Sequence, residues 1–211
     1  MKLYTISGLG ADQRVFQYLK LKIDTIPLEW ISPKKNETIE TYAKRLALKI
    51  NPQEPFAIIG VSFGGLIATE ISKQLRPDLT ILISSAETRS ELRPIYRLIG
   101  KMGIIKLIPR KLFLPPTIPA AWAFGTNRKK LLGNILKDTD PTFTKWAVNE
   151  LVNWTNTSKI KNPCLRIVGT NDKLIPPKNL ENKILISGGE HFMIVDKADE
   201  ISAIINGKLN R

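Results

Sequence analysis

The sequence has a single cysteine and a single histidine among its 211 residues. Cys164 cannot form an internal disulfide, so we expect a chain that folds in a reducing compartment. The scarcity of both residues also argues against a metal site built from clustered His and Cys ligands. Nucleotide-binding signatures of the G-x-G-x-x-G and Walker types are absent from the sequence. We therefore expect neither a metal nor a cofactor.

Long apolar runs are missing as well. No stretch approaches the roughly 18 apolar residues of a membrane span, and the run in residues 1–8 is too short for a secretory signal. We expect a cytoplasmic protein without a membrane span. The sequence leaves the oligomeric state open.

Acidic residues are outnumbered by 32 Lys and Arg to 19 Asp and Glu, a formal charge of +13. The basic residues occur along most of the chain, and no RNA-binding motif, zinc-finger spacing or DNA-reading helix is recognisable, so we expect no specific nucleic-acid partner. In residues 89–111, a basic residue recurs every fourth position from Arg89 to Lys101, although Pro94 would disturb the first turns of a helix there. This stripe, which continues to Lys111, is either a solvated face or a weak attractor of anionic surfaces and substrates.

Strand-like and helix-like patterns alternate over most of the chain, which predicts a mostly parallel sheet with helices on both faces. A chain of 211 residues with 43% hydrophobic content is long enough for one sizeable core. Short apolar strands are predicted at residues 2–7, 24–31, 56–61, 79–84, 164–169 and 183–187, with helices at 15–19, 39–50, 65–75 and around 201–205.

The alternation lapses between residues 89 and 157, where helical patterns and several prolines replace the strands. The clearer helix begins at Asp140-Pro141, an acid that can cap and a proline that fits a helix start. We therefore divide the chain into a core formed by residues 1–87 and 158–211 and a helical insertion at 88–157. Three of the four tryptophans lie in the insertion, and they are more often packing residues than ligand contacts: Trp122, Trp146 and Trp154.

The segment Gly60-Val61-Ser62-Phe63-Gly64 lies between a predicted strand and a predicted helix. In a G-x-S-x-G turn of this kind a Cβ at either glycine would clash with neighbouring backbone, and the serine is held in a strained geometry with its hydroxyl projecting. The turn also directs the first N–H groups of the helix, including that of Phe63, toward the reacting carbon. Ser62 is therefore a candidate nucleophile; the alternative is a small residue that fills a tight turn.

A serine nucleophile needs a base, and His191 is the one histidine available. Asp172 and His191 both follow predicted strands downstream of Ser62, and the carboxyl ends of parallel strands meet at one edge of a sheet. The order Ser, Asp, His is an independent condition that this chain meets. Three other acids compete with Asp172 for the place beside the histidine: Glu87, Glu190 and Asp196.

These motifs resemble those of the α/β-hydrolase superfamily over nearly the whole chain. Residues 60–65 resemble its nucleophile elbow, 169–176 its acid-bearing strand end and 189–192 its histidine loop. The resemblance implies an α/β-hydrolase fold with a sheet of about six strands, a helical cap after Ala86, and Ser62, Asp172 and His191 as nucleophile, acid and base. Residues 7–10 are similar to the oxyanion loop, which makes the Leu9 N–H the second donor beside Phe63, although Ser7 stands where many members have histidine.

The expected activity is hydrolysis of a carboxylic ester or thioester of a small to medium, fairly apolar substrate through an acyl-enzyme on Ser62. Two alternatives remain at this point. The same triad serves carbon–carbon bond hydrolysis, a lyase step or acyl transfer in other settings, and a non-catalytic binding protein with a vestigial site is the third possibility.

Overall fold

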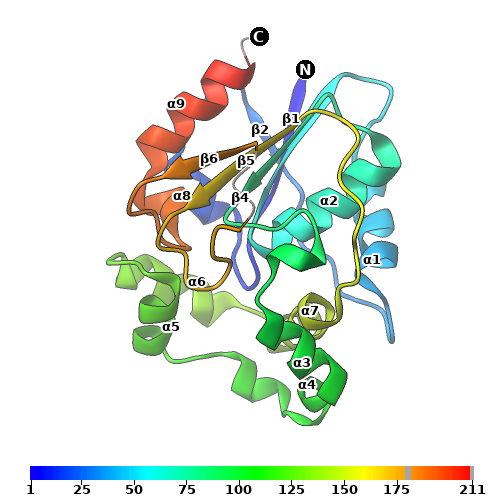
Figure 1. Cartoon of the computed structure of the whole chain (residues 1–211), viewed down its shortest axis with the longest axis vertical. Coiled ribbons are helices and arrows are strands. Elements are labelled where there is room, and N and C mark those ends of the chain that lie inside the picture. Colours follow the sequence, from blue (N-terminus) through cyan, green and yellow to red (C-terminus); the bar gives the residue numbers. More distant parts are fainter. Residues whose placement is uncertain (179–181, 210–211) are drawn as a thin grey trace.

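A computed structural model describes residues 1–178 and 182–209. Within these residues six strands form one parallel sheet in the order β2-β1-β3-β4-β5-β6 (Figure 1). The strands are β1 (Lys2–Ile6), β2 (Thr25–Pro27), β3 (Phe56–Val61), β4 (Leu79–Ile83), β5 (Cys164–Gly169) and β6 (Lys183–Ile186). The sheet of six parallel strands confirms the predicted fold class, and it brings the carboxyl ends of all six strands to one edge.

Several predicted elements differ in extent or type from the structure. The strand expected at residues 24–31 is confined to β2, an exposed edge strand that pairs with β1 on one side only. The helix expected at 15–19 is a single 3₁₀ turn, η1 (Gln13–Phe16), which Asp12 begins by accepting the Arg14 N–H. The helix expected from residue 65 begins two residues earlier, at Phe63.

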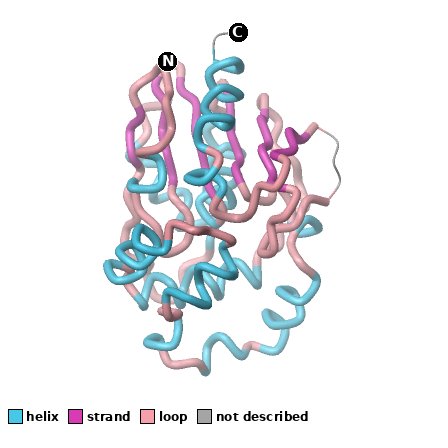
Figure 2. Tube along the Cα trace, turned by 90° about the vertical axis from the view of Figure 1, so that its left-hand side faces the viewer, coloured by secondary structure: helices cyan, strands magenta, loops and turns pink. Residues whose placement is uncertain are grey.

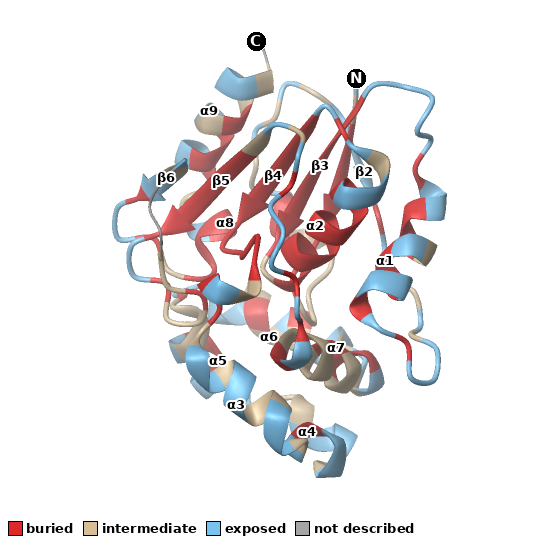
Figure 3. Ribbon diagram, turned by 45° about the vertical axis from the view of Figure 1, so that its right-hand side comes forward, coloured by how far each residue is buried: buried red, intermediate tan, exposed pale blue. Residues whose placement is uncertain are grey.

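Alternate residues of the buried strands supply the two faces of the core. On one face Tyr4 and Ile58 pack against α1 (Ile39–Leu46) and α2 (Phe63–Leu75). On the other face Leu3 and Ile59 pack against α8 (Met193–Asp196) and α9 (Ala198–Leu209). All six residues of β3 are buried, and the interior of the sheet is covered on both sides (Figure 3). This two-sided burial explains why the central strands are continuous apolar runs rather than alternating ones.

Between β4 and β5 the chain forms only helices in the structure, as the lapse in the pattern predicts. We call residues 88–157 the helical segment. It lies beyond the carboxyl ends of the strands, on the side opposite both chain termini (Figure 2). Its elements are η3 (Arg89–Glu91), α3 (Pro94–Met102), α4 (Ile104–Leu107), η4 (Arg110–Phe113), α5 (Thr117–Phe124), α6 (Lys129–Asp138) and α7 (Pro141–Asn153).

Helix α7 begins where the sequence predicts, with Asp140 accepting the Thr142 N–H at 2.8 Å and Pro141 in the first turn. Two tryptophans, one within α7 and one directly after it, pack the helical segment on the core. Trp146 donates to the Glu37 carbonyl and packs against the Tyr42 ring, and Trp154 donates to the Glu70 carboxylate at 2.9 Å. Pro94 occupies the first turn of α3, so it starts this helix rather than disturbing it.

None of the helices within the described residues has both the length and the hydropathy needed to cross a bilayer. Cys164, at the start of β5, is free of any disulfide. Burial raises the pKa of its thiol to about 12, which leaves it protonated at neutral pH. A protonated, largely enclosed thiol is a poor nucleophile, so Cys164 acts as a core side chain.

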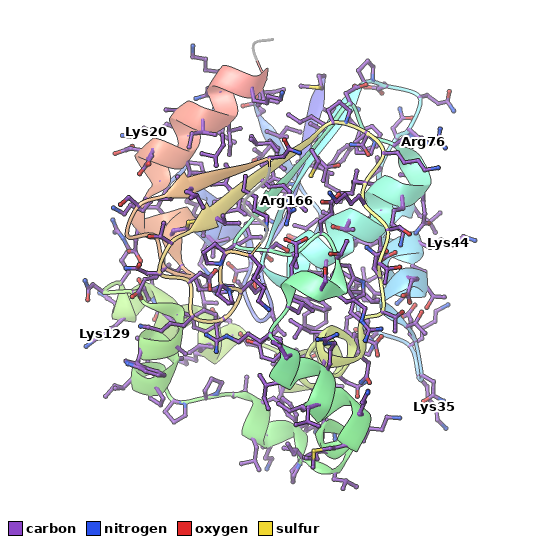
Figure 4. All side chains as sticks on the ribbon, viewed as in Figure 1. Lys20, Lys35, Lys44, Arg76, Lys129 and Arg166 are labelled. Atoms are coloured by element: carbon purple, nitrogen blue, oxygen red, sulfur yellow. The ribbon has the colours of Figure 1, made fainter. Side chains whose placement is uncertain are left out.

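A buried group of four charges joins the base of the helical segment to the sheet. Arg166 of β5 lies between Glu87 and Glu91, and Lys183 of β6 donates to Glu91 at 2.6 Å. Burial acts to raise the pKa of Glu91, but the Lys183 hydrogen bond and the Arg166 charge outweigh it, so this pKa lies below its ordinary value. Arg166 is 6% exposed and stands inside the molecule, whereas the basic residue Lys44 on α1 points outward (Figure 4). The two bases neutralise the two acids. All four side chains are buried, so water could not take the place of a lost partner.

We expect Arg166→Met to lower the free energy of unfolding by about 3–5 kcal/mol, because it leaves Glu87 buried without its cation. The matched change Lys44→Met removes an exposed charge and should stay within about 0.5 kcal/mol of the wild type. Urea unfolding followed by circular dichroism measures both variants. A loss below about 1 kcal/mol for Arg166→Met would mean that solvent reaches the cluster.

Candidate active site

Ser62 occupies the sharp turn between β3 and α2. Its backbone has φ 52° and ψ −121°, a conformation that a residue with a side chain rarely adopts and that costs about 1–3 kcal/mol. Three hydrogen bonds pin the residue there: its N–H donates to the Ile83 carbonyl, and its carbonyl accepts from the Gly65 N–H and the Ser85 hydroxyl at 2.7 Å. The backbone of β4 and the side chain of Ser85 therefore help to hold the strained turn in place.

The glycines around Ser62 allow the start of α2 to pack directly on the backbone of β3 and of the end of β1, which a residue with a side chain would prevent. A Cβ on Gly60 would come within 2.5 Å of the Gly64 carbonyl oxygen, and one on Gly64 would overlap the backbone carbonyls of Ile6 and Ser7. Both clashes are with backbone, which has little room to give way. The structure thus confirms the steric reason that the motif gives for both glycines.

The hydroxyl of Ser62, the ring of His191 and the carboxylate of Asp172 form one chain of hydrogen bonds. His191 Nε2 lies 2.8 Å from Ser62 Oγ, and Nδ1 lies 2.8 Å and 3.0 Å from the two Asp172 oxygens. Because a carboxylate only accepts, Nδ1 carries the ring proton and Nε2 is left to accept from the hydroxyl. Three residues that are distant in the sequence therefore meet at the carboxyl edge of the sheet.

Asp172 is 3% exposed and His191 is 4% exposed, so the polar groups between them are shielded from water. One Asp172 oxygen also accepts the backbone N–H groups of Leu174 and Ile175, each at 2.9 Å. These bonds satisfy the buried carboxylate and fix the direction in which it faces the imidazole.

The three competing acids lie elsewhere. Glu87 belongs to the Arg166 cluster, where it also accepts the Ile160 N–H at 2.7 Å. Glu190 lies 3.4 Å from the Lys173 ammonium, and Asp196 lies 3.6 Å from Arg128. Each of these carboxylates has its own partner, whereas Asp172 is directed at the imidazole.

The loop after β1 lies against the serine turn. A Cβ on Gly8 would stand 3.4 Å from the Ser62 Cβ, so the Gly8-Leu9 backbone passes directly beside the nucleophile candidate. Ser7 donates its hydroxyl to the Ala11 carbonyl at 2.8 Å and closes this loop on itself. Phe63 is the first residue of α2, and its side chain is fully buried. An N–H in the first turn of a helix has no partner within that helix.

A narrow cavity of about 40 Å³ opens onto Ser62 and His191. Its wall is almost entirely apolar, and the helical segment contributes four of the lining side chains: Phe124, Leu132, Ile135 and Leu136. A second cavity of about 220 Å³ shares Gly10, Ala11 and Ile135 with the first, and Trp30 lines it together with three aspartates. The three tryptophans of the helical segment, Trp122, Trp146 and Trp154, line neither cavity.

Two contributors to the site were not foreseen from the sequence. Phe124 of α5 places its ring 5.6 Å from the His191 ring, and its carbonyl accepts the Phe192 N–H at 3.0 Å. Ser85 supports the Ser62 carbonyl from the end of β4. The position of Ser85 just after a buried strand was an available signal, whereas nothing in the local pattern indicates which residue of α5 faces inward.

Among residues 1–178 and 182–209, no group of three or more His, Cys, Asp or Glu side chains is arranged to hold a metal ion.

No family model matches this sequence, and no curated protein matches it. Solved structures do match the fold. A thermophilic esterase from Thermogutta terrifontis superposes with a TM-score of 0.76 at 15% identity, over 100% of this chain and 89% of the esterase. MenH from S. aureus superposes with a TM-score of 0.71 at 18% identity, over 100% of this chain and 93% of MenH.

A lipase-esterase related protein from Clostridium acetobutylicum also superposes, with a TM-score of 0.67 at 19% identity, over 98% of this chain and 93% of that chain. At these identities the likeness extends to the fold. The chain has the α/β-hydrolase fold, as its motifs predict.

We expect Gly64→Ala to lower the free energy of unfolding by about 3 kcal/mol, because the new methyl group would push α2 away from the end of β1. Gly207 in α9 is the matched control, since a Cβ there meets nothing within 4 Å. Gly207→Ala should raise stability by up to about 1 kcal/mol. Urea unfolding separates the two, and equal effects would contradict the close approach that we describe.

Proposed function

We propose that this protein is a serine hydrolase that cleaves a carboxylic ester or thioester. The observation that carries the proposal is the continuous hydrogen-bond chain from the Ser62 hydroxyl through His191 to Asp172, at distances of 2.8 Å on both sides of the imidazole. The strained turn that presents the hydroxyl supports the proposal further. So does the similarity of the fold to solved structures of esterases.

In the first half-reaction Ser62 Oγ attacks the carbonyl carbon while its proton passes to His191 Nε2. Asp172 holds the imidazole in the tautomer that can accept this proton and stabilises the resulting cation. The same proton then passes to the leaving alcohol or thiol, and the C–O or C–S bond breaks. The acyl group remains on Ser62. In the second half-reaction water gives a proton to His191, its oxygen attacks the acyl carbon, and the proton returns to Ser62 as the acid leaves.

The negative charge that develops on the carbonyl oxygen needs donors already in place. We assign this role to the N–H groups of Phe63 and Leu9. The first begins α2, and the second follows the glycine that packs on Ser62. Backbone donors fixed by a helix start and a closed loop cost no reorganisation during the reaction, and losing one typically costs about 100- to 1000-fold in rate.

The two cavities favour an ester with a short acyl chain and a larger alcohol part. A space of about 40 Å³ beside Ser62 holds only about three water-sized groups. Its apolar wall suits a few methyl or methylene groups. The adjoining space of about 220 Å³ is wider and carries Asp12, Asp138 and Asp140 at its rim, so it suits a more polar leaving group. In this proposal the helical segment acts as a cap that closes over the acyl group.

We expect a fluorophosphonate probe to label the wild-type protein, Ser62→Ala to abolish labelling, and His191→Ala to reduce it strongly, because the hydroxyl reacts only when a base removes its proton. Ester hydrolysis should fall about 10⁴-fold in Asp172→Asn, which leaves the geometry intact but favours the wrong tautomer.

Glu190→Gln and Asp196→Asn are matched controls for Asp172→Asn, since each neutralises a carboxylate near the histidine loop that faces another partner. Both should keep hydrolysis within about threefold of the wild type. A protein that is folded by circular dichroism yet unlabelled would contradict the proposal and indicate binding without catalysis.

We expect hydrolysis of p-nitrophenyl esters to be highest for acyl chains of about two to four carbons, because longer chains exceed the cavity. Leu136→Ala should move the optimum to longer chains by enlarging that cavity. Leu131→Ala, on the same helix but outside the cavity lining, should leave the optimum unchanged. A wild-type optimum at eight carbons or more would overturn the assignment of the narrow cavity to the acyl chain.

A further inference from the structure

The formal charge of this chain is concentrated in one stretch. Residues 92–137 contain ten Lys or Arg and no Asp or Glu, whereas the other 165 residues contain 22 Lys or Arg against 19 acids. This stretch therefore carries ten of the thirteen net positive charges in 46 residues. The basic stripe noted at residues 89–111 lies mostly within this stretch, and outside the stretch acids nearly balance the basic residues.

Large exposed apolar side chains gather in the same stretch. Of the 13 that are exposed in the described part of the chain, it contains eight, with exposed fractions from 37% to 84%. They are Ile95, Leu98, Met102, Ile104, Leu107, Leu112, Ile118 and Trp122. Single exposed apolar residues are common on proteins, but a cluster of this size marks an interaction surface.

The two kinds of side chain share the outer side of the helical segment. On α3, Ile95, Leu98 and Met102 recur at helical spacing, and the other side of the helix packs on α7, where a Cβ on Gly100 would come within 2.5 Å of the Val152 carbonyl. Figure 3 shows α5, α3 and α4 as the outermost row of the molecule, opposite both termini. The apolar side chains therefore point away from the protein.

Hydrogen bonds hold this row in position. The Lys145 ammonium donates to the carbonyls of Lys106 and Ile108, at 2.8 Å and 2.7 Å, and the Tyr96 hydroxyl donates to the Leu174 carbonyl at 2.9 Å. Lys145 is a half-buried residue of α7, so the exposed turns between α4 and η4 are anchored from below. The exposed residues form a fixed face rather than a loose loop.

We propose that this face docks on an anionic lipid bilayer. The docking face consists of the eight apolar residues above together with five exposed basic residues: Arg97, Lys101, Lys106, Arg110 and Lys111. A bilayer with anionic headgroups offers acyl chains to the first set and phosphate or carboxylate charge to the second. Trp122, 72% exposed, suits the boundary between headgroups and chains.

Other kinds of partner match either the positive charge or the apolar side chains of this face, but not both. Nucleic acid would use the basic side chains and leave Leu107, Leu112 and Ile118 against a charged, hydrated backbone. A second copy of this chain would cover the apolar residues but would bring the five exposed basic residues of one docking face against the same five of another. An anionic bilayer is the partner that both the charge and the apolar residues fit.

Flotation with two kinds of vesicle tests the proposal: phosphatidylcholine alone, and phosphatidylcholine with 30% phosphatidylglycerol, at low and at high salt. We expect the wild type to float with the anionic vesicles, to float little with the neutral ones, and to be partly released by salt. The triple variant Lys106→Gln, Arg110→Gln, Lys111→Gln should reduce partitioning at least about tenfold, since each basic residue near the surface contributes about fivefold.

A matched triple variant, Lys20→Gln, Lys44→Gln, Arg76→Gln, removes the same charge from exposed sites away from the docking face (Figure 4) and should lose little binding. The pair Leu107→Ser, Leu112→Ser should also reduce partitioning about tenfold, and the residual binding should become more sensitive to salt. Ser62→Ala should bind as the wild type does, so that docking is judged separately from the proposed hydrolysis.

Absence of flotation with anionic vesicles at low salt would overturn the proposal. Equal losses of vesicle binding in the two triple variants would also overturn the proposal, because binding would then depend on the net charge of the protein and not on the docking face. A third contrary result would be retention of a 20-base-pair DNA duplex that is stronger than vesicle binding and unaffected by Leu107→Ser, Leu112→Ser, which would identify the face as a nucleic-acid surface.

Discussion

The close approach of α2 to the ends of β1 and β4 sets the position of every group near Ser62. Gly64 seats the first turn of the helix on the carbonyls of Ile6 and Ser7, where any side chain would overlap them. The loop that carries Leu9 is thereby placed beside the serine turn. On the other side Gly65 lies against Ser85, whose hydroxyl holds the Ser62 carbonyl. The backbone strain at Ser62 persists because the strands on both sides are buried and paired with β3.

Charge serves two different purposes in this molecule. The buried cluster around Arg166 joins Glu87 and Glu91, at the base of the helical segment, to the strand that leads to Asp172. The charges of this cluster cancel. Removing one member would leave a buried charge without its partner, which would destabilise the fold. Nine of the ten basic residues of 92–137 are exposed, and among the described residues Arg128 is the one of the ten that pairs with an acid. The same residue types thus hold the helical segment to the core on its inner side and give its outer side a strong positive charge.

Much of the sheet and the meeting of Ser62, Asp172 and His191 could be predicted because each depends on a local signal. A buried parallel strand is a short apolar run, as at residues 56–61, and polar residues that follow such strands gather at one edge. The length of strand β2 was overestimated because it is an edge strand that pairs on one side only, which depends on its place in the sheet. The choice of Asp172 over Glu190 depends on which way each carboxylate faces, which spacing does not determine.

The helical segment was harder still to interpret from sequence. Its helical character and the helix at α7 were foreseen, but the inward direction of Phe124 and the outward direction of Trp122, two residues apart on α5, result from how that helix packs. The concentration of positive charge in residues 92–137 can be found from the sequence alone, by counting acidic as well as basic residues. Its coincidence with exposed apolar side chains required the packing of α3 on α7.

The helical segment is bonded to both loops that flank Ser62. At the end of α5 the Phe124 carbonyl accepts the Phe192 N–H beside His191, and at the end of α6 the Thr139 hydroxyl donates to the Gly10 carbonyl beside Leu9. A shift of these helices therefore moves the imidazole and the Gly8–Gly10 backbone as well as the cavity wall. In the proposed hydrolase, substitutions in α5 and α6 would therefore alter turnover together with substrate preference, so the two properties would change together.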